Sequence, residues 1–159
     1  MCSFFKKENG FTLIELIAVI LVASILSVTA MSKWSGTGIN IASEAEKIAS
    51  DIRYVQSYAS THDQRYRINF LASSYGFTNG TGSTVLLHPV TNASSITMTS
   101  GVSLTYTHTF LVFDGKGIPY TNTAVPGTAL ATTATITLTS GSSSRTVRVS
   151  PETGRVVVQ

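Results

Sequence analysis

Residues 11–30, FTLIELIAVILVASILSVTA, form the longest apolar run of the chain and decide its fold. Twenty helical residues span about 30 Å, the thickness of the hydrocarbon core of a bilayer. The polar side chains among residues 11–28 are Thr12, Glu15, Ser24 and Ser27. An ionisable group inside such a run is costly and marks a functional position by default. The sequence therefore predicts a membrane-inserted helix in which Glu15 has a role.

Three interpretations of this N-terminus compete. A secretory signal peptide would have a basic start, an apolar middle and small residues at Val28-Thr29-Ala30, but a carboxylate in the apolar part opposes translocation. An ordinary membrane anchor has the right length and a positive flank, and it leaves Glu15 unexplained. The third interpretation uses the residues that precede the run, Lys6-Lys7-Glu8-Asn9-Gly10.

Residues 6–15, KKENGFTLIE, resemble the class III signal of type IV prepilins and type II secretion pseudopilins. In that family a prepilin peptidase cleaves after the glycine, here Gly10, and the new N-terminal residue, here Phe11, is N-methylated. The methylated amine stays cationic, so the resemblance implies an assembly role for Glu15. Its carboxylate could pair, inside the membrane, with the amine of its own or of a neighbouring subunit.

This resemblance sets the expected domain organisation and partners. Residues 1–10 are a cleaved leader, and residues 11–34 are a transmembrane and assembly helix. The implied partners are other pilins or pseudopilins, the prepilin peptidase, an assembly platform protein and inner-membrane lipid. The implied location is the bacterial inner membrane, crossed once, with the globular domain in the periplasm and the chain later incorporated into a filament.

The composition favours an exported, β-rich domain. Charged residues make up 12 % of the chain, while Ser, Thr and Val are abundant. Cys2 is the one cysteine and lies in the leader, so the processed chain would have no disulfide. The formal net charge of the whole chain is +3, which is too small to argue nucleic-acid binding from the total.

Residues 35–61 are expected to form a hinge followed by an amphipathic helix. Gly36 and Gly38 weaken a helix, so we expect a bend or break there, either a melting point used in assembly or a simple hinge. Ser43-Glu44-Ala45-Glu46 has the form of a capping box, and the helix should end near Thr61-His62. Glu44, Lys47, Asp51 and Arg53 are expected to point away from the apolar face, which comprises Ala45, Ile48, Ala49, Ile52, Val55, Gln56 and Ala59.

Residues 62–159 are expected to form a β-rich domain. Short alternating or apolar segments, separated by turn residues, predict strands at 66–71, 75–77, 85–87, 96–98, 102–106, 110–113, 134–139, 145–150 and 155–158. A helix followed by short antiparallel strands predicts the α+β class. The expected fold is a long N-terminal helix, half in the membrane and half amphipathic, packed on an antiparallel sheet.

Three internal segments narrow the family. Residues 51–57, DIRYVQS, residues 113–119, FDGKGIP, and residues 145–156, RTVRVSPETGRV, are similar to segments of the GspH/FimT-type pseudopilin domain. The resemblance implies a pilin-like, non-enzymatic subunit, a pseudopilin or minor pilin at or near the tip of its filament. Both a type II secretion pseudopilus and a type IV pilus use the same N-terminal signal, so the choice between them stays open.

The alternative function is a pilus-tip subunit that binds DNA, as in natural transformation, or adheres. Some FimT-type pilins bind DNA through a C-terminal G-R-x-R motif; here Gly154-Arg155-Val156-Val157 has valine at the second arginine position. Arg145, Arg148 and Arg155 could form a small cluster on one hairpin. Three phosphate contacts give weak, salt-sensitive binding. Solvated arginines that protect a sheet surface and edge are the favoured interpretation, with nucleic acid kept as the disfavoured partner.

The sequence predicts no enzyme. His62, His88 and His108 lack the spacing of metal ligands, and no Gly-x-Ser-x-Gly motif is present. Gly115-Lys116-Gly117 is followed by Ile118-Pro119 rather than by a helix, so it indicates a turn and not a phosphate site. We therefore expect no catalytic residues, no metal and no cofactor. An anchored periplasmic enzyme is the least favoured hypothesis.

Overall fold

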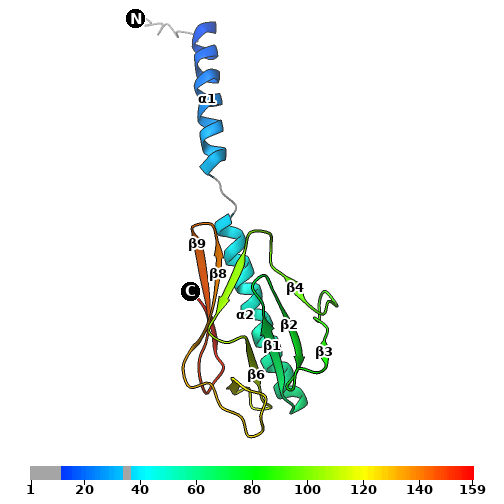
Figure 1. Cartoon of the computed structure of the whole chain (residues 1–159). Coiled ribbons are helices and arrows are strands. Elements are labelled where there is room, and N and C mark those ends of the chain that lie inside the picture. The colour runs from blue at the N-terminus through cyan, green and yellow to red at the C-terminus, as the bar shows by residue number, and fades with distance from the viewer. Residues whose placement is uncertain (1–11, 34–36) are drawn as a thin grey trace, which may run out of the picture. The chain divides into compact units, whose positions relative to one another are not determined.

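The structure, a computed structural model, describes residues 12–33 and 37–159, with side chains for residues 12–27 and 40–159. The chain divides into two compact units, Met1–Gly36 and Thr37–Gln159. The first contains helix α1 and the second contains helix α2 and all the strands (Figure 1). The expected cleavage site at Gly10 and Phe11 lies outside the described residues, as does Gly36 of the expected bend or break, while Gly38 lies inside helix α2.

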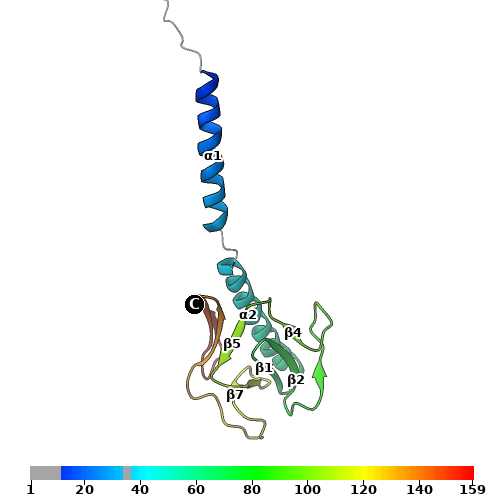
Figure 2. The same cartoon turned by 45° about the horizontal axis from the view of Figure 1, so that its top comes forward.

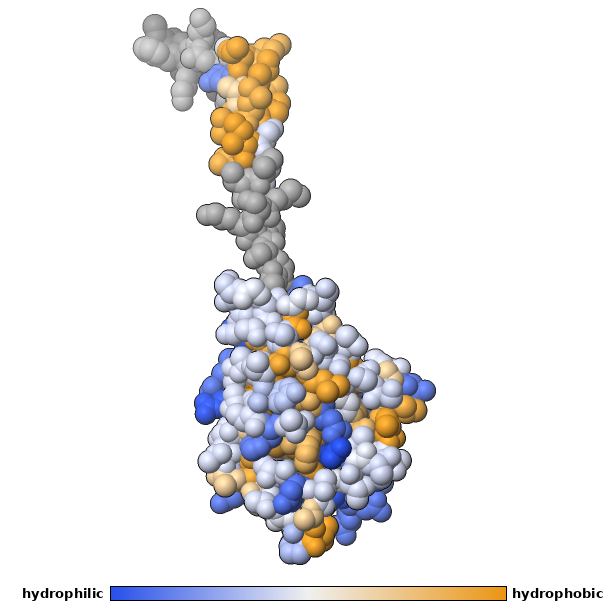
Figure 3. All heavy atoms as spheres, in the orientation of Figure 1, coloured by the Kyte–Doolittle hydropathy of each residue, from blue (hydrophilic) through white to orange (hydrophobic). Residues whose placement is uncertain are grey.

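Helix α1 is Leu13–Lys33 and contains most of the apolar run. Its large aliphatic side chains are exposed along the described part of the helix, and hydrophobic atoms cover that surface (Figure 3). Within the described residues, no helix combines the length and hydropathy that a membrane crossing needs. The expected membrane segment, residues 11–30, reaches beyond the side chains that are described.

Helix α2 is Thr37–His62 and ends where the sequence predicts. It begins before the predicted capping box, so Ser43 and Glu46 lie inside the helix and that prediction is wrong. The reason is Ile41, which is fully buried and extends the apolar face by one turn toward the N-terminus. Packing of this extra turn continues the helix past Ser43 toward the N-terminus.

The strands form two antiparallel sheets, and none of the described pairings is parallel. The first sheet has the order β3-β2-β1-β6-β7, with β4 also paired to β2; its strands are β1 (Tyr66–Phe70), β2 (Ser74–Asn79), β3 (Val85–Leu86), β4 (Ile96–Thr97), β6 (Phe110–Phe113) and β7 (Pro119–Tyr120). The second has the order β10-β9-β8-β5; its strands are β5 (Ser103–Tyr106), β8 (Ala134–Ser140), β9 (Ser143–Val149) and β10 (Val156–Val158).

Strand β5 joins the second sheet by pairing with β8, although it lies in the chain between β4 and β6 of the first sheet. Ser103 lies opposite Thr139, and Tyr106 lies opposite Ile136. These partners are far apart in the sequence, and strand alternation gives no information about which strands pair. The nine predicted strands and the α+β class are confirmed, whereas the tenth strand of the described residues, β7, and the division into two sheets are not predicted by the sequence.

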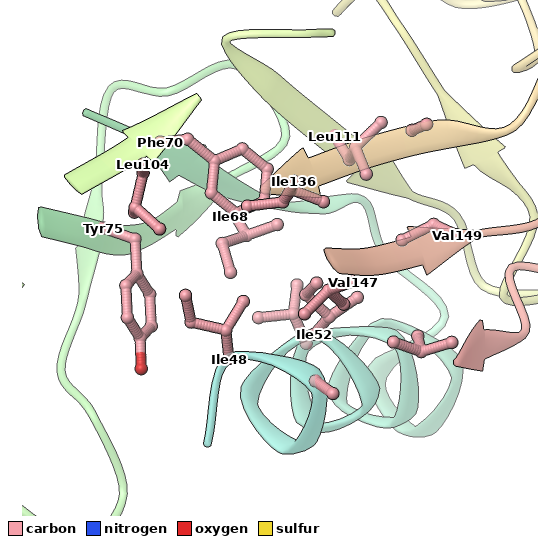
Figure 4. Close-up of a cluster of buried hydrophobic side chains, with 14 of the residues drawn as sticks. Ile48, Ile52, Ile68, Phe70, Tyr75, Leu104, Leu111, Ile136, Val147 and Val149 are labelled. Carbon is pink, nitrogen blue, oxygen red and sulfur yellow. The ribbon is translucent and has the colours of Figure 1, made fainter. Parts of the chain in front are cut away.

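The core lies between α2 and the inner faces of both sheets. Helix α2 contacts β1 and β6 of the first sheet and β8, β9 and β10 of the second. In two views the green strands of the first sheet and the orange strands of the second lie to either side of α2 (Figures 1 and 2). Ile48 and Ile52 of α2 point toward strand residues of both sheets, among them Ile68 and Val147 (Figure 4). Burial of this face is what joins helix and sheets into one unit.

Candidate functional site

Glu15, the predicted assembly residue, takes part in a capping box at the start of α1. The backbone N–H of Thr12 donates to Glu15 Oε2 at 3.4 Å, and the backbone N–H of Glu15 donates to Thr12 Oγ1 at 3.3 Å. This reciprocal pattern is the T-x-x-E signature, which sequence analysis missed although it is present at residues 12–15. The box keeps the Glu15 carboxylate at the N-terminal end of α1, beside Thr12.

Ser24 and Ser27 of α1 satisfy their own hydroxyl groups. Ser24 Oγ donates to the Ile20 carbonyl and Ser27 Oγ to the Ala23 carbonyl, each at 2.7 Å. Such bonds back onto the preceding turn let a hydroxyl sit on an apolar helix without a partner elsewhere. Glu15 is then the one ionisable side chain among residues 12–27, which sets it apart from the rest of the described α1 surface.

The three arginines of the predicted cluster are not all brought together. Arg145 and Arg148 line one surface hollow on the second sheet with Thr135, Thr146 and Gln159. Arg148 Nη1 donates to Gln159 Oε1 at 3.2 Å, and Arg145 Nη1 donates to the Ser144 carbonyl at 3.3 Å. Arg155 is exposed but does not line this hollow.

Arg148 lies on the outer face of β9. It is exposed, while its neighbours Val147 and Val149 are fully buried. Alternation along β9 therefore gives the face of this arginine correctly.

The three family segments meet at Gln56 of α2. Its Nε2 donates to the Gly117 carbonyl at 2.9 Å and to the Thr153 carbonyl at 3.0 Å. Gly117 belongs to the FDGKGIP turn, and Thr153 to the turn between β9 and β10. The spacing of Gln56 predicts only a place on the apolar face, whereas in the structure its side chain holds two distant turns against α2.

Asp114 organises the FDGKGIP turn. Its Oδ1 accepts bonds from the backbone N–H groups of Lys116 and Ile118, both at 2.9 Å, and its Oδ2 accepts from the Tyr120 hydroxyl at 3.1 Å. The backbone N–H groups of Lys116 and Ile118 are thus hydrogen-bonded within the turn. The turn interpretation of residues 115–117 is confirmed.

Two acidic residues of α2 are buried, which corrects the expectation that they point away from the core. Asp51 is 8 % exposed and Glu44 is 9 % exposed. They lie seven residues apart, on one side of the helix, and each meets a polar group from the strands and their loops. The Thr99 hydroxyl donates to Glu44 Oε1, and the Tyr75 hydroxyl donates to Asp51 Oδ2 at 2.5 Å. Arg53, which was also expected to point away from the apolar face, is exposed as predicted, and its guanidinium donates to the Val156 carbonyl at 3.1 Å.

His88 completes the network around Asp51. Its Nδ1 accepts bonds from the backbone N–H groups of Val90 and Thr91, both at 3.2 Å. An accepting Nδ1 carries no proton, so the proton of the neutral ring is on Nε2, which lies 3.2 Å from Asp51 Oδ1 and donates to it. His88 therefore links the loop after β3 to α2. The described residues hold no group of three or more His, Cys, Asp or Glu side chains suited to a metal ion.

Stability should fall at alkaline pH through Tyr75. Burial, followed by the hydrogen bond and negative charge of Asp51, raises the pKa of the Tyr75 phenol far above its ordinary value. An unfolded tyrosine titrates near pH 10, so the stability linked to the neutral phenol is complete below about pH 10 and is lost as the pH rises above it. Tyr75→Phe should unfold more easily at pH 7, by about 1.5–3 kcal/mol for a bond to a charged group, and lose less stability above pH 10.

The measurement is urea unfolding of the Thr37–Gln159 unit from neutral to alkaline pH. Tyr106→Phe, which leaves the Asp51 network intact, is the matched control. An alkaline loss of equal size in Tyr75→Phe and in the unaltered protein would contradict the assignment.

Comparisons with known proteins agree with this architecture. A family model described as type II transport protein GspH matches residues 44–154, and one described as the prokaryotic N-terminal methylation motif matches residues 5–31. Comparison with curated protein sequences finds no significant match. The resemblance drawn from the leader and the internal segments is confirmed.

Two crystal structures of the type IV minor pilin FimU from Pseudomonas aeruginosa are similar in fold. The first has a TM-score of 0.55 at 16 % sequence identity and covers 75 % of this chain and 87 % of its own. The second, in another crystal form, has a TM-score of 0.53 at 16 % identity, with 74 % and 90 % coverage. At this identity the likeness shows the fold.

Proposed function

This chain belongs to the GspH family of type II transport proteins, and from that membership we propose that it is a non-enzymatic pilin-like subunit that assembles into a filament through its N-terminal helix. A peptidase removes residues 1–10 after Gly10, and Phe11 is N-methylated, as the methylation motif over residues 5–31 supports. The processed segment anchors the chain in the inner membrane before assembly, with the Thr37–Gln159 unit in the periplasm.

The exposed apolar surface of α1 is the observation that carries this proposal. Large aliphatic side chains from Leu13 to Leu26 are exposed on it. Apolar surface left in water costs about 25 cal/mol per Å², so a natural chain covers such a helix. Lipid tails can cover it before assembly, and the equivalent helices of neighbouring subunits can cover it in a filament.

Glu15 gives that helix a fixed position among its neighbours. In a medium of low dielectric constant, a carboxylate and a methylated amine attract each other strongly, and either one alone is costly. The capping box holds Glu15 at the start of α1, where the amine of its own or an adjacent subunit can meet it. Other pilins, the prepilin peptidase and a platform protein are the partners that this assembly requires.

A second candidate function, at the tip of the filament, is binding of an anionic polymer such as DNA. The shared hollow of Arg145 and Arg148 favours it. The Arg148 guanidinium already bonds Gln159, and two arginines give fewer phosphate contacts than the three expected, so binding would be weak and salt-sensitive. Filament assembly is therefore the function we propose first.

The N-terminus of the protein purified from its host tests the proposal. Mass spectrometry of the full chain is expected to find N-methylated Phe11 as the first residue, and immunoblotting is expected to find the chain in filaments sheared from the cells. A first residue of Met31, or a retained leader, would contradict it. Comparing protein secretion and piliation in a deletion strain then distinguishes a secretion pseudopilus from a pilus.

A further inference from the structure

An apolar surface lies on the free edge of the first sheet. Strand β3 ends the order β3-β2-β1-β6-β7, and it pairs with β2 on one side. Val85 and Leu87 are more than half exposed, and Val90, in the following loop, is 85 % exposed. Figure 3 shows hydrophobic atoms at the side of the domain where β3 lies in Figure 1. We call Val85, Leu87 and Val90 the edge patch.

The edge patch lacks one usual protection of an exposed strand, a charged side chain, and the short length of β3, two residues, is the protection that it has. Natural proteins place lysines or other charged residues on free edges, because unpaired backbone groups invite pairing with another chain. No Asp, Glu, Lys or Arg occurs between Arg67 and Asp114 in the sequence, a segment that includes β2, β3 and β4. A charged side chain packed against this apolar edge would lose its hydration at a cost in free energy. The edge therefore favours a partner segment that is itself uncharged.

Hydrogen bonds within the loop and to Asp51 of α2 fix the loop that carries Val90. The His88 N–H donates to the Ala93 carbonyl and the Asn92 N–H to the His88 carbonyl, both at 2.9 Å. The His88 ring accepts from the amides of Val90 and Thr91 and donates to buried Asp51. A network that joins α2 to this loop thus presents an exposed valine at its surface. Rigid presentation lowers the entropy lost when the side chain binds.

From these observations we propose that the edge patch docks an extended, apolar and uncharged segment of a neighbouring pilin-like subunit. The free edge of β3 offers the backbone groups of two residues to such a segment, and Val85 in β3 and Leu87 just after it offer exposed side chains beside them. This inference rests on the proposed function, because it needs the partner to be held close by.

The size of the patch explains why the partner must be a neighbour in the filament. Stable complexes between free proteins bury about 1,200–2,000 Å² in total, and three side chains supply only a part of that area. Two subunits whose N-terminal helices share one filament meet at a high effective concentration, so a small patch is sufficient.

The test uses the full chain in its host and compares two valines of similar exposure. Val90→Asp adds a charge to the edge patch, and Val125→Asp adds the same charge to a different loop, where Val125 is 80 % exposed. The fraction of the chain in sheared filaments, relative to membranes, should fall about tenfold for Val90→Asp, equivalent to about 1.4 kcal/mol, and stay unchanged for Val125→Asp. Equal incorporation of both variants, or an equal fall in both, overturns the docking proposal.

A second readout identifies the occupant. A photo-crosslinking residue at position 90 is expected to join the chain to another subunit with the methylation motif, within an uncharged segment. A product with lipid alone, or with a protein that lacks the methylation motif, overturns the proposal. Val90→Ser, which removes the apolar side chain without adding a charge, should show a smaller fall in the same direction.

The two proposals fail in distinguishable ways. If the unaltered chain is absent from filaments, the proposed function fails and the docking proposal falls with it. If the unaltered chain and Val90→Asp are incorporated equally, only the docking proposal fails.

Discussion

A Glu15→Val variant is expected to insert into the membrane normally and to be almost absent from filaments. Valine is more favourable than glutamate in an apolar segment, so insertion does not suffer. In the filament the methylated amine of Phe11 then has no carboxylate to meet. Breaking a buried ion pair by removing one partner costs about 3–5 kcal/mol, so incorporation should fall by two orders of magnitude or more. The measurement is the ratio of the chain in sheared filaments to that in membranes.

Two further variants separate the charge of Glu15 from its role in the capping box. Glu15→Gln keeps an acceptor for the Thr12 amide and removes the charge. Thr12→Ala removes the cap and keeps the charge. We expect Glu15→Gln to be defective, as Glu15→Val is, and Thr12→Ala to assemble. If Glu15→Gln assembles and Thr12→Ala does not, Glu15 acts in helix capping and the charge-pairing role is wrong.

A Gly154→Ala variant should lose about 3 kcal/mol of its free energy of unfolding, from backbone strain and overpacking together. Gly154 has φ +63°, where a side chain is strained, and an added Cβ would lie 2.7 Å from the Gly117 carbonyl oxygen and 2.6 Å from Gln56 Nε2. Backbone must move to relieve the first contact. Movement of Gln56 would also weaken its bonds to Gly117 and Thr153. Denaturant unfolding of the Thr37–Gln159 unit measures the loss.

Gly141→Ala is the matched control for this prediction. Gly141 has φ +57° in the turn between β8 and β9, and an added Cβ meets nothing within 4 Å. Its substitution should therefore cost only the conformational strain of the left-handed region, about 1–2 kcal/mol. An equal loss in both variants would mean that the meeting point of the two turns at Gln56 is not tightly packed.

Residues close together in the sequence supported most of the correct predictions. The end of α2 at His62 follows from apolar periodicity that stops, and β6 at Phe110–Phe113 from an apolar segment bounded by a turn. The β8–β9 hairpin was also predicted, with strands that are longer and a turn that is shorter than expected, because Ser140 pairs directly with Ser143. The T-x-x-E pattern at Thr12 could have been found in the same way.

Contacts between distant residues account for what was missed. Asp51 and Glu44 have the composition of a solvated helix face, and only the presence of Tyr75, His88 and Thr99 opposite them makes burial tolerable. Gln56 fits an apolar stripe by spacing, and its role depends on two carbonyl groups that chain folding brings to it.

By itself, the sequence determined most of the segments, the α+β class and the family, because a carboxylate in an apolar run and strand alternation are properties of neighbouring residues. The tertiary structure alone decided that β5 joins β8 in a second sheet, that Asp51 and His88 hold the loop of Val90, and that Arg155 does not join Arg145 and Arg148 in their hollow. Each of these depends on which strand lies beside which. That choice is set by packing the whole core at once, and no short stretch of residues encodes it.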